Sequence, residues 1–76
     1  MPFSYKPLWK LLVEHELTKT EFREKLGLST ATLAKLGKDE YVSLEVIDKI
    51  CTHFGVQPNE IMEHKPELRK YHLIKI

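Results

Sequence analysis

The fold is decided by residues 17–37, which read LTKTEFREKLGLSTATLAKLG. A helix is expected over residues 19–26, because Thr18 and Glu21 have the spacing of a capping box at a helix start. Gly27 follows where a left-handed residue commonly ends a helix. The stretch therefore predicts a short helix that ends in a sharp turn.

A second short helix is expected directly after the turn, over residues 30–36. Ser29 is a good N-cap residue for it, and Gly37 can end it. One apolar set is expected to join the two helices: Phe22, Leu26, Leu28, Leu33 and Leu36. Such a set holds the helices at a steep angle and leaves the outer face of the second one free. A helix presented in this way fits the major groove of DNA, which is about 12 Å wide.

Three more helices are expected around this pair, over residues 7–16, 44–54 and 58–63. Prolines open the first and the last, where a missing N–H costs nothing, and Ser43 and Gly55 suit the two ends of the middle one. The side chains expected on the apolar faces of the first and middle helices are Leu8, Trp9, Leu11, Leu12, Val13, His15, Leu44, Ile47, Ile50, Cys51 and Phe54. These patterns predict an all-α fold, a five-helix bundle with a helix-turn-helix at its second and third helices.

The two ends of the chain read differently from the helical part. Residues 1–6 are expected to form an N-terminal arm, residues 7–64 the domain and residues 65–76 a C-terminal tail. The tail ends in strand-forming residues, so it is interpreted either as a strand or dimerisation segment or as disordered chain. A further expectation is an N-terminal strand that pairs with the chain after the fifth helix, either in the same subunit or in its partner.

Composition narrows the classes of protein that fit. The 76 residues suffice for one domain with a thin core, and the net charge is only +1. A single cysteine, Cys51, excludes an internal disulfide framework and is interpreted as a small buried hydrophobe. No apolar stretch spans a bilayer and no signal peptide opens the chain, which predicts a cytoplasmic protein.

Chemistry of other kinds is not indicated. The four histidines do not have the spacing of metal ligands: His15, His53, His64 and His72. No nucleophile is grouped with a base, as a catalytic site would require. We therefore expect no enzyme activity, no metal, no cofactor and no small-molecule ligand.

Residues 17–29 resemble the helix-turn-helix of the Cro/CI-type (XRE family) repressors. The resemblance continues through residues 30–37, Ser43-Leu44-Glu45 and Phe54-Gly55-Val56, and it covers about three-quarters of the chain. It implies a fold of the lambda-repressor-like type and sequence-specific binding of double-stranded DNA. It also implies a small transcriptional regulator that acts as a homodimer, as a repressor or autoregulator.

The resemblance also implies roles for single residues. The positions that match base contacts are Ser29, Thr30, Ala31 and Lys35. The positions that match phosphate contacts are Thr18, Lys19, Thr32 and Lys38. Capping alone is the competing interpretation for Thr18 and Ser29, and ordinary solvated charge is the competing interpretation for the three lysines.

Two places depart from the family pattern. Arg23 stands where many members have a small residue, and its guanidinium is expected in solvent or on phosphate. Asp39 and Glu40 are acidic where members often have basic or neutral residues. They are expected to weaken contact with the DNA backbone or to face away from it.

Two further expectations concern partners. A dimer interface is expected from the fifth helix and at least one of the two terminal segments, 3–5 and 71–76, with these residues singled out: Ile61, Met62, Tyr71 and Leu73. The competing hypothesis is a protein-interaction module that keeps this fold and has little DNA affinity. The charge of +1 and the acidic Asp39-Glu40 pair favour that hypothesis, whereas Lys19, Lys35 and Lys38 argue against it.

Overall fold

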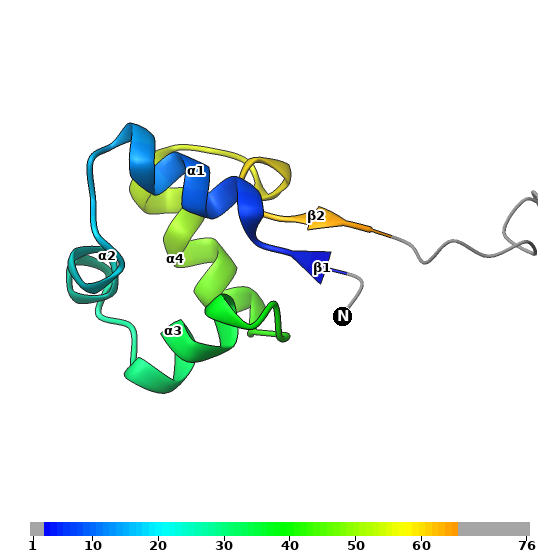
Figure 1. Cartoon of the computed structure of the whole chain (residues 1–76), viewed down its shortest axis with the longest axis horizontal. Helices are drawn as coiled ribbons and strands as arrows, with labels where there is room; N and C mark the ends of the chain where they lie inside the picture. Colours follow the sequence, from blue (N-terminus) through cyan, green and yellow to red (C-terminus); the bar gives the residue numbers. More distant parts are fainter. Residues whose placement is uncertain (1–2, 66–76) are drawn as a thin grey trace, which may run out of the picture.

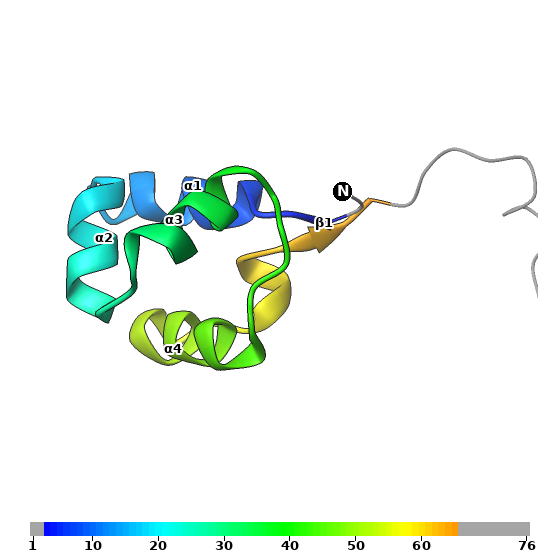
Figure 2. The same cartoon turned by 90° about the horizontal axis from the view of Figure 1, so that it is seen from below.

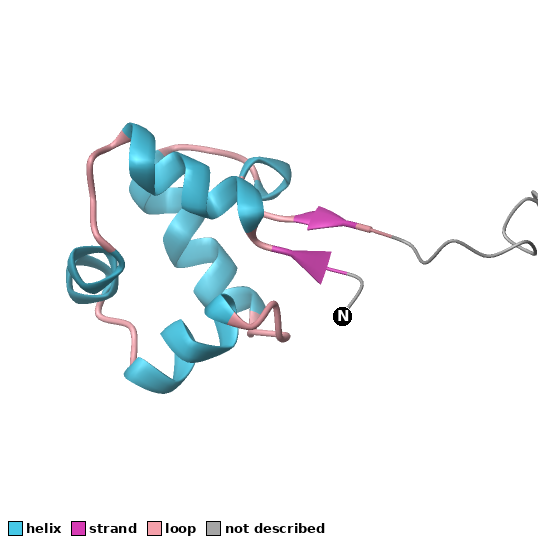
Figure 3. Cartoon of the chain, in the orientation of Figure 1, coloured by secondary structure: helices cyan, strands magenta, loops and turns pink. Residues whose placement is uncertain are grey.

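The structure, a computed structural model, describes residues 3–65. Within them, four α-helices and a 3₁₀ turn form a helical body, and two short strands form a ribbon beside it (Figure 1 and Figure 3). The elements in chain order are β1 (Phe3–Ser4), α1 (Lys6–Glu14), α2 (Lys19–Leu26), α3 (Thr30–Gly37), α4 (Leu44–Phe54), η1 (Pro58–Glu60) and β2 (Glu63–His64). The ribbon and α2 lie at opposite ends of the body (Figure 1 and Figure 2).

Local signals set the ends of the helices. The hydroxyl oxygens of Thr18, Ser29 and Ser43 each accept a hydrogen bond from the backbone N–H three residues later. Gly27 and Gly55, with φ of 69° and 67°, end α2 and α4 in the left-handed conformation. The predicted bounds of these two helices are thereby confirmed.

The end of α3 differs from the expectation. Gly37 is the last residue of the helix, and the left-handed residue is Asp39, with φ of 58°. Aspartate is one of the few residues other than glycine that tolerate this conformation. The chain can therefore continue one residue past the predicted end before it turns.

The prediction of a fifth helix over residues 58–63 is wrong. Only the 3₁₀ turn η1 forms, in which the Glu60 carboxylate accepts a hydrogen bond from the Gln57 N–H at 3.0 Å. The next side chain, Ile61, is fully buried in the core. Two residues further on, the chain is extended in β2, so no room remains for a helix.

The ribbon itself matches the expected N-terminal strand. β1 and β2 are antiparallel, with Phe3 opposite His64 and Ser4 opposite Glu63. The fold is thus four helices with a short ribbon, a correction of the predicted five-helix bundle.

The core gathers side chains from all four helices, the turns between them and both ends of the described chain. Its buried members are Tyr5, Leu8, Leu12, Phe22, Leu28, Leu36, Ile47, Ile50 and Ile61. Phe22 stacks on Phe54, with ring centroids 6.3 Å apart, and Leu26 and Leu33 pack against the cluster from its edge. The apolar set predicted to join the two central helices is therefore confirmed.

Three residues expected on apolar faces are exposed instead: Val13, His15 and Leu44. Val13 is 75% exposed, because it lies one position beyond Leu12 and so points away from the core. Leu44, the first residue of α4, is 80% exposed although its spacing from Ile47 and Cys51 places it near the buried face of the helix. In residues 3–65, no helix is long and apolar enough to cross a membrane.

Candidate nucleic-acid interface

The outer face of α3 is a row of small and basic side chains. Ala31, Lys35 and Lys38 follow one another at helical spacing, and all three are exposed. Leu36 is buried on the opposite side, and Leu33 is half-buried. Because short side chains leave the helix surface accessible, this face can approach a flat or grooved partner closely.

The N-terminal end of α3 carries free backbone donors. The first hydrogen bond within the helix runs from the Leu33 N–H to the Ser29 carbonyl, so the N–H groups of Thr30 and Ala31 precede it. The Ser29 hydroxyl accepts from the Thr32 N–H and donates to the Thr32 hydroxyl oxygen, both at 3.0 Å. The two free N–H groups and the helix dipole favour an anion at this end.

The N-terminal end of α2 has a complete capping box. The Thr18 N–H donates to the Glu21 carboxylate at 2.9 Å, and the Glu21 N–H donates to the Thr18 hydroxyl at 3.1 Å. Hydrogen bonds from the Thr18 backbone and side chain lower the pKa of the exposed Glu21 carboxyl. Thr18 therefore has a structural role whether or not it also meets a phosphate.

Lys19 is held by an aromatic ring. Its ammonium lies 4.5 Å from the centroid of the Trp9 ring, the geometry of a cation–π contact. Trp9 belongs to α1 and Lys19 to α2, so the local sequence does not predict the contact between them. The contact fixes a positive charge beside the first turn of α2.

Arg23 supports the turn of the helix-turn-helix. Its Nη1 donates to the Leu28 carbonyl at 3.2 Å, and its Nη2 lies 3.7 Å from the Glu24 carboxylate. The expectation of a guanidinium in solvent or on phosphate is corrected, since only 26% of the side chain is exposed. A long basic residue here binds the turn instead of leaving room for close helix packing.

The acidic pair after α3 is also explained. The Asp39 carboxylate accepts a hydrogen bond from the Tyr5 N–H at 3.1 Å, so it faces the protein. Glu40 is exposed, and its backbone carbonyl accepts a hydrogen bond from the Tyr5 hydroxyl at 2.9 Å. Ser4 and Tyr5, placed by sequence in an N-terminal arm, are buried.

The three lysines predicted to face DNA are free of ion pairs within residues 3–65, although the net charge of the chain is only +1. Lys19, Lys35 and Lys38 are exposed, and none forms an ion pair with another residue of the described range 3–65. The ion pairs within that range involve Arg23 and Lys65. The three unpaired lysines are therefore available to a polyanion.

The residues expected at a dimer interface fall in different environments. Ile61 is fully buried in its own chain, so its side chain has no surface left for a partner. Met62 is half-buried beside the ribbon. Tyr71 and Leu73 lie outside the described residues.

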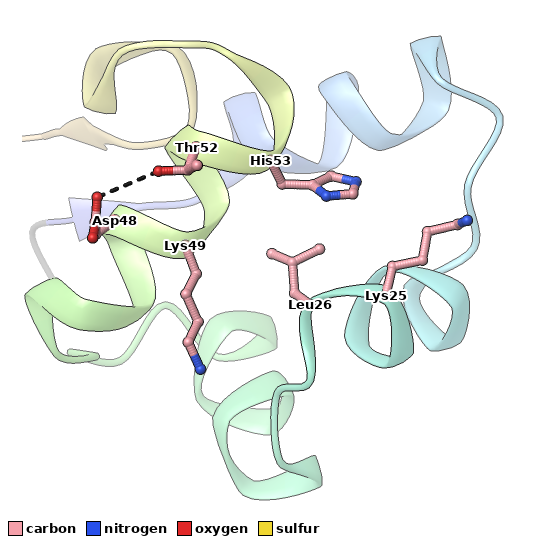
Figure 4. A pocket seen from close by; sticks show the side chains of 6 residues that line it. All are labelled: Lys25, Leu26, Asp48, Lys49, Thr52 and His53. Carbon is pink, nitrogen blue, oxygen red and sulfur yellow. Dashed lines mark hydrogen bonds between the residues drawn. The ribbon is translucent and has the colours of Figure 1, made fainter.

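A shallow, open groove runs between α2 and α4 (Figure 4). Its lining residues are Lys25, Leu26, Asp48, Lys49, Thr52 and His53. The Thr52 hydroxyl donates to the Asp48 carboxylate at 3.4 Å (Figure 4), and the basic side chains of the lining are those of Lys25, Lys49 and His53. Across residues 3–65, no group of three or more histidine, cysteine, aspartate or glutamate side chains is arranged to hold a metal ion.

Comparison with known proteins agrees with this geometry. A family model described as the Cro/C1-type HTH DNA-binding domain matches residues 7–67. The chain is similar to the uncharacterized HTH-type transcriptional regulator YozG of Bacillus subtilis (strain 168), at 29% identity over 59 residues, 75% of this chain and 70% of that protein. It is also similar to the crystal structure of the transcriptional regulator VanUg, with a TM-score of 0.83 and 45% identity over 87% of this chain and 88% of that one. The chain therefore belongs to the family of Cro/C1-type helix-turn-helix DNA-binding domains.

Proposed function

We propose that this chain is a dimeric transcriptional regulator that inserts α3 into the major groove of a specific operator. The observation that carries the proposal is the outer face of α3, where Ala31, Lys35 and Lys38 are exposed and where the first turn also presents free backbone N–H groups. Small and basic side chains on a helix that is supported from behind suit entry into the groove. Action on the chromosome implies a cytoplasmic location.

The residues have separate roles in this proposal. Base edges are read by Lys35, by Ala31 against a thymine methyl group, and by the hydroxyls of Ser29 and Thr30. Phosphates are contacted by Lys19 and Lys38, and by the hydroxyls of Thr18 and Thr32. Because no forked amide or guanidinium lies among these base-reading residues, DNA shape supplies part of the specificity.

Dimerisation completes the proposed binding unit. One short recognition helix buries little surface, and dimers of helix-turn-helix proteins read two half-sites one turn of DNA apart. The proposed interface uses Met62 together with Tyr71 and Leu73, with Ile61 supporting Met62 from the core. A self-complementary dimer that occupies its own promoter would act as a repressor or autoregulator.

The test is a titration with mixed genomic duplex DNA at two salt concentrations. A dimer with three or four cationic contacts per subunit neutralises roughly 6–8 phosphates, so affinity is expected to fall about a thousandfold or more between 50 and 200 mM salt. Absence of binding at 50 mM salt, with the helical circular dichroism signal intact, would overturn the proposal.

A second candidate function is a protein-interaction module without DNA affinity. The groove between α2 and α4 favours it, since Lys25, Lys49 and His53 suit an acidic peptide. A fluorescent poly-glutamate peptide titrated beside the DNA separates the two. Saturable binding of the peptide without binding of DNA would favour the second function, and the reverse pattern would favour the first.

A further inference from the structure

The loop that follows the recognition helix is held from far away in the chain. Asp39 has a left-handed backbone, with φ of 58°, although Gly37 stands two residues earlier. The Asp39 carboxylate accepts a hydrogen bond from the Tyr5 N–H at 3.1 Å, across 34 residues of sequence. An aspartate in a conformation that suits glycine better therefore makes a contact that glycine could not make.

The Tyr5 side chain makes the second half of the same clamp. It is only 3% exposed, and its hydroxyl donates to the Glu40 carbonyl at 2.9 Å. One residue thus bonds to two consecutive residues of the loop, through its backbone and through its side chain. Two such bonds fix both the position and the direction of the backbone between them.

The clamp also joins the loop to the ribbon. Phe3, two residues before Tyr5, lies edge-on to Tyr41 with ring centroids 6.1 Å apart, and edge-on to His64 at 5.0 Å. Phe3 also pairs with His64 in the ribbon. The N-terminal segment therefore bridges the loop after α3 and the strand that leads to the C-terminal tail.

Lys38 lies directly before the clamped residues, at the end of α3. It is the C-cap residue of α3, it is exposed, and it directly precedes Asp39. A lysine side chain is long and flexible, so the backbone at its base decides which phosphate the ammonium can reach. A loop free to move would spread that charge over many positions and raise the entropic cost of each contact.

We propose that Tyr5 and Asp39 are positioning residues for DNA binding, which clamp the loop after α3 so that Lys38 is held in place for a phosphate. The inference rests on the proposed DNA-binding function. It assigns to the buried N-terminal segment a part in binding that the surface residues alone do not reveal.

Two substitutions of Asp39 give a matched test. Asp39→Gly keeps the left-handed backbone and removes the acceptor, whereas Asp39→Asn keeps an acceptor oxygen and a residue that tolerates this conformation. Duplex binding at 50–200 mM salt is expected to weaken roughly two- to tenfold for Asp39→Gly and to stay near wild type for Asp39→Asn. Tyr5→Phe, which keeps the ring in the core, is expected to weaken binding over the same range.

The salt dependence shows whether the loss comes from a phosphate contact. If Lys38 loses its place, the slope of log K against log salt falls by about 0.9 per subunit, as for Lys38→Ala. In a Lys38→Ala background, Tyr5→Phe is expected to have no further effect on DNA affinity. A role in stability alone would leave the slope unchanged.

Different failures have different meanings. Wild-type protein that does not bind duplex DNA at 50 mM salt overturns the proposed function and this inference together. Wild-type binding with unchanged affinity and slope for Asp39→Gly and Tyr5→Phe overturns only the inference. So does an effect of Tyr5→Phe that is equally large with and without Lys38.

Discussion

The helix-turn-helix and the ribbon end of this small protein are held together in opposite ways. In the helix-turn-helix, polar contacts join near neighbours: Thr18 with Glu21, Ser29 with Thr32, and Arg23 with Leu28. At the ribbon end, Tyr5 reaches Asp39 and Glu40, and Phe3 pairs with His64. Short-range contacts define the helix-turn-helix, and long-range contacts attach it to the rest of the chain.

This difference separates two kinds of dependence. A helix that is capped within three residues has its ends set locally, so distant changes that leave the core intact should leave those ends in place. A loop fixed by residues far along the chain depends on the whole fold. Substitutions in the two regions should therefore differ in how far their effects reach.

The largest effect is expected where both regions share the core. Phe22→Ala removes a fully buried ring that stacks on Phe54, and it should lower the free energy of unfolding by about 3–5 kcal/mol. Urea unfolding followed by circular dichroism measures the loss. Leu44→Ala is the control, because Leu44 is 80% exposed and should change stability by no more than about 0.5 kcal/mol. Equal losses for the two variants would contradict the burial described for α2.

The next effect concerns two lysines of the helix-turn-helix, Lys35, which is proposed to read a base, and Lys19, which is proposed to contact a phosphate. Lys35→Ala should cost about 1–3 kcal/mol on the operator and relax specificity at one base pair. Lys19→Ala should weaken binding to all sequences alike and lower the salt slope by about one per subunit. Equal losses for Lys35→Ala on operator and random duplexes would show that Lys35 does not read a base.

The fluorescence of Trp9 can report directly whether Lys19 moves when DNA binds. Trp9 is the single tryptophan of the chain, and the Lys19 ammonium lies 4.5 Å from its ring centroid. DNA that draws Lys19 onto a phosphate should change the tryptophan emission, and Lys19→Ala should remove that change. Retention of the full change in Lys19→Ala would place the effect elsewhere.

A smaller effect is expected for the short-range cap. Thr18→Ala removes the acceptor for the Glu21 N–H and should lower the free energy of unfolding by about 1 kcal/mol, whereas Thr18→Ser should stay near wild type. Thermal unfolding measures both. If Thr18→Ala weakens DNA binding more than its stability loss accounts for, the hydroxyl also serves a phosphate. Unchanged stability in Thr18→Ala would contradict the capping role.

The smallest effect is expected in the pH dependence of stability, through the Tyr5 phenol of the long-range clamp. Burial of the phenol, and then the Asp39 carboxylate, raise the pKa of Tyr5, while a hydrogen bond with the Val42 backbone lowers it in part. The folded protein therefore favours the neutral phenol. That contribution is complete below the ordinary tyrosine pKa of about 10 and is lost as the pH rises through the raised value.

The measurement is unfolding by urea at pH values from 8 to about 11, for wild type and for Tyr5→Phe. Wild type should lose stability more steeply above about pH 10, since only wild type has this phenol to ionise. Lysine titration affects both proteins alike, so their difference isolates Tyr5. Parallel profiles throughout would contradict the burial of the phenol.

The same division explains what the sequence could predict. The capping residues, Gly27, Gly55 and the bounds of α2 and α4 follow from spacing within a few residues, and all agree with the structure. The fifth helix failed because the burial of Ile61 and the pairing of β2 with β1 decide that segment. The pairing was expected from the sequence, but nothing in the neighbouring residues shows that the strand begins directly after Met62.

The candidate site divides in a similar way. Helical periodicity predicts that Ala31 and Lys35 lie outside the core, and the family resemblance implies that these residues and Lys38 face DNA. The contact of Lys19 with Trp9 and the clamp of Tyr5 on Asp39 could not be predicted in this way, because the partners belong to separate elements. Aspartate after a helix was a weak signal for a left-handed turn, but it could not show that the carboxylate would face Tyr5. Side-chain direction at such positions is decided by the assembled fold.

The claim that α3 is the DNA-binding surface is tested most directly by NMR. Amide shifts of the ¹⁵N-labelled full chain are followed while a duplex is added at 50 mM salt. If α3 enters the major groove, the largest changes are expected at residues 29–31 and at Lys35, with smaller ones at Lys19 and Lys38. Changes concentrated along the groove at Lys25, Lys49 and His53, with α3 unaffected, would contradict that claim.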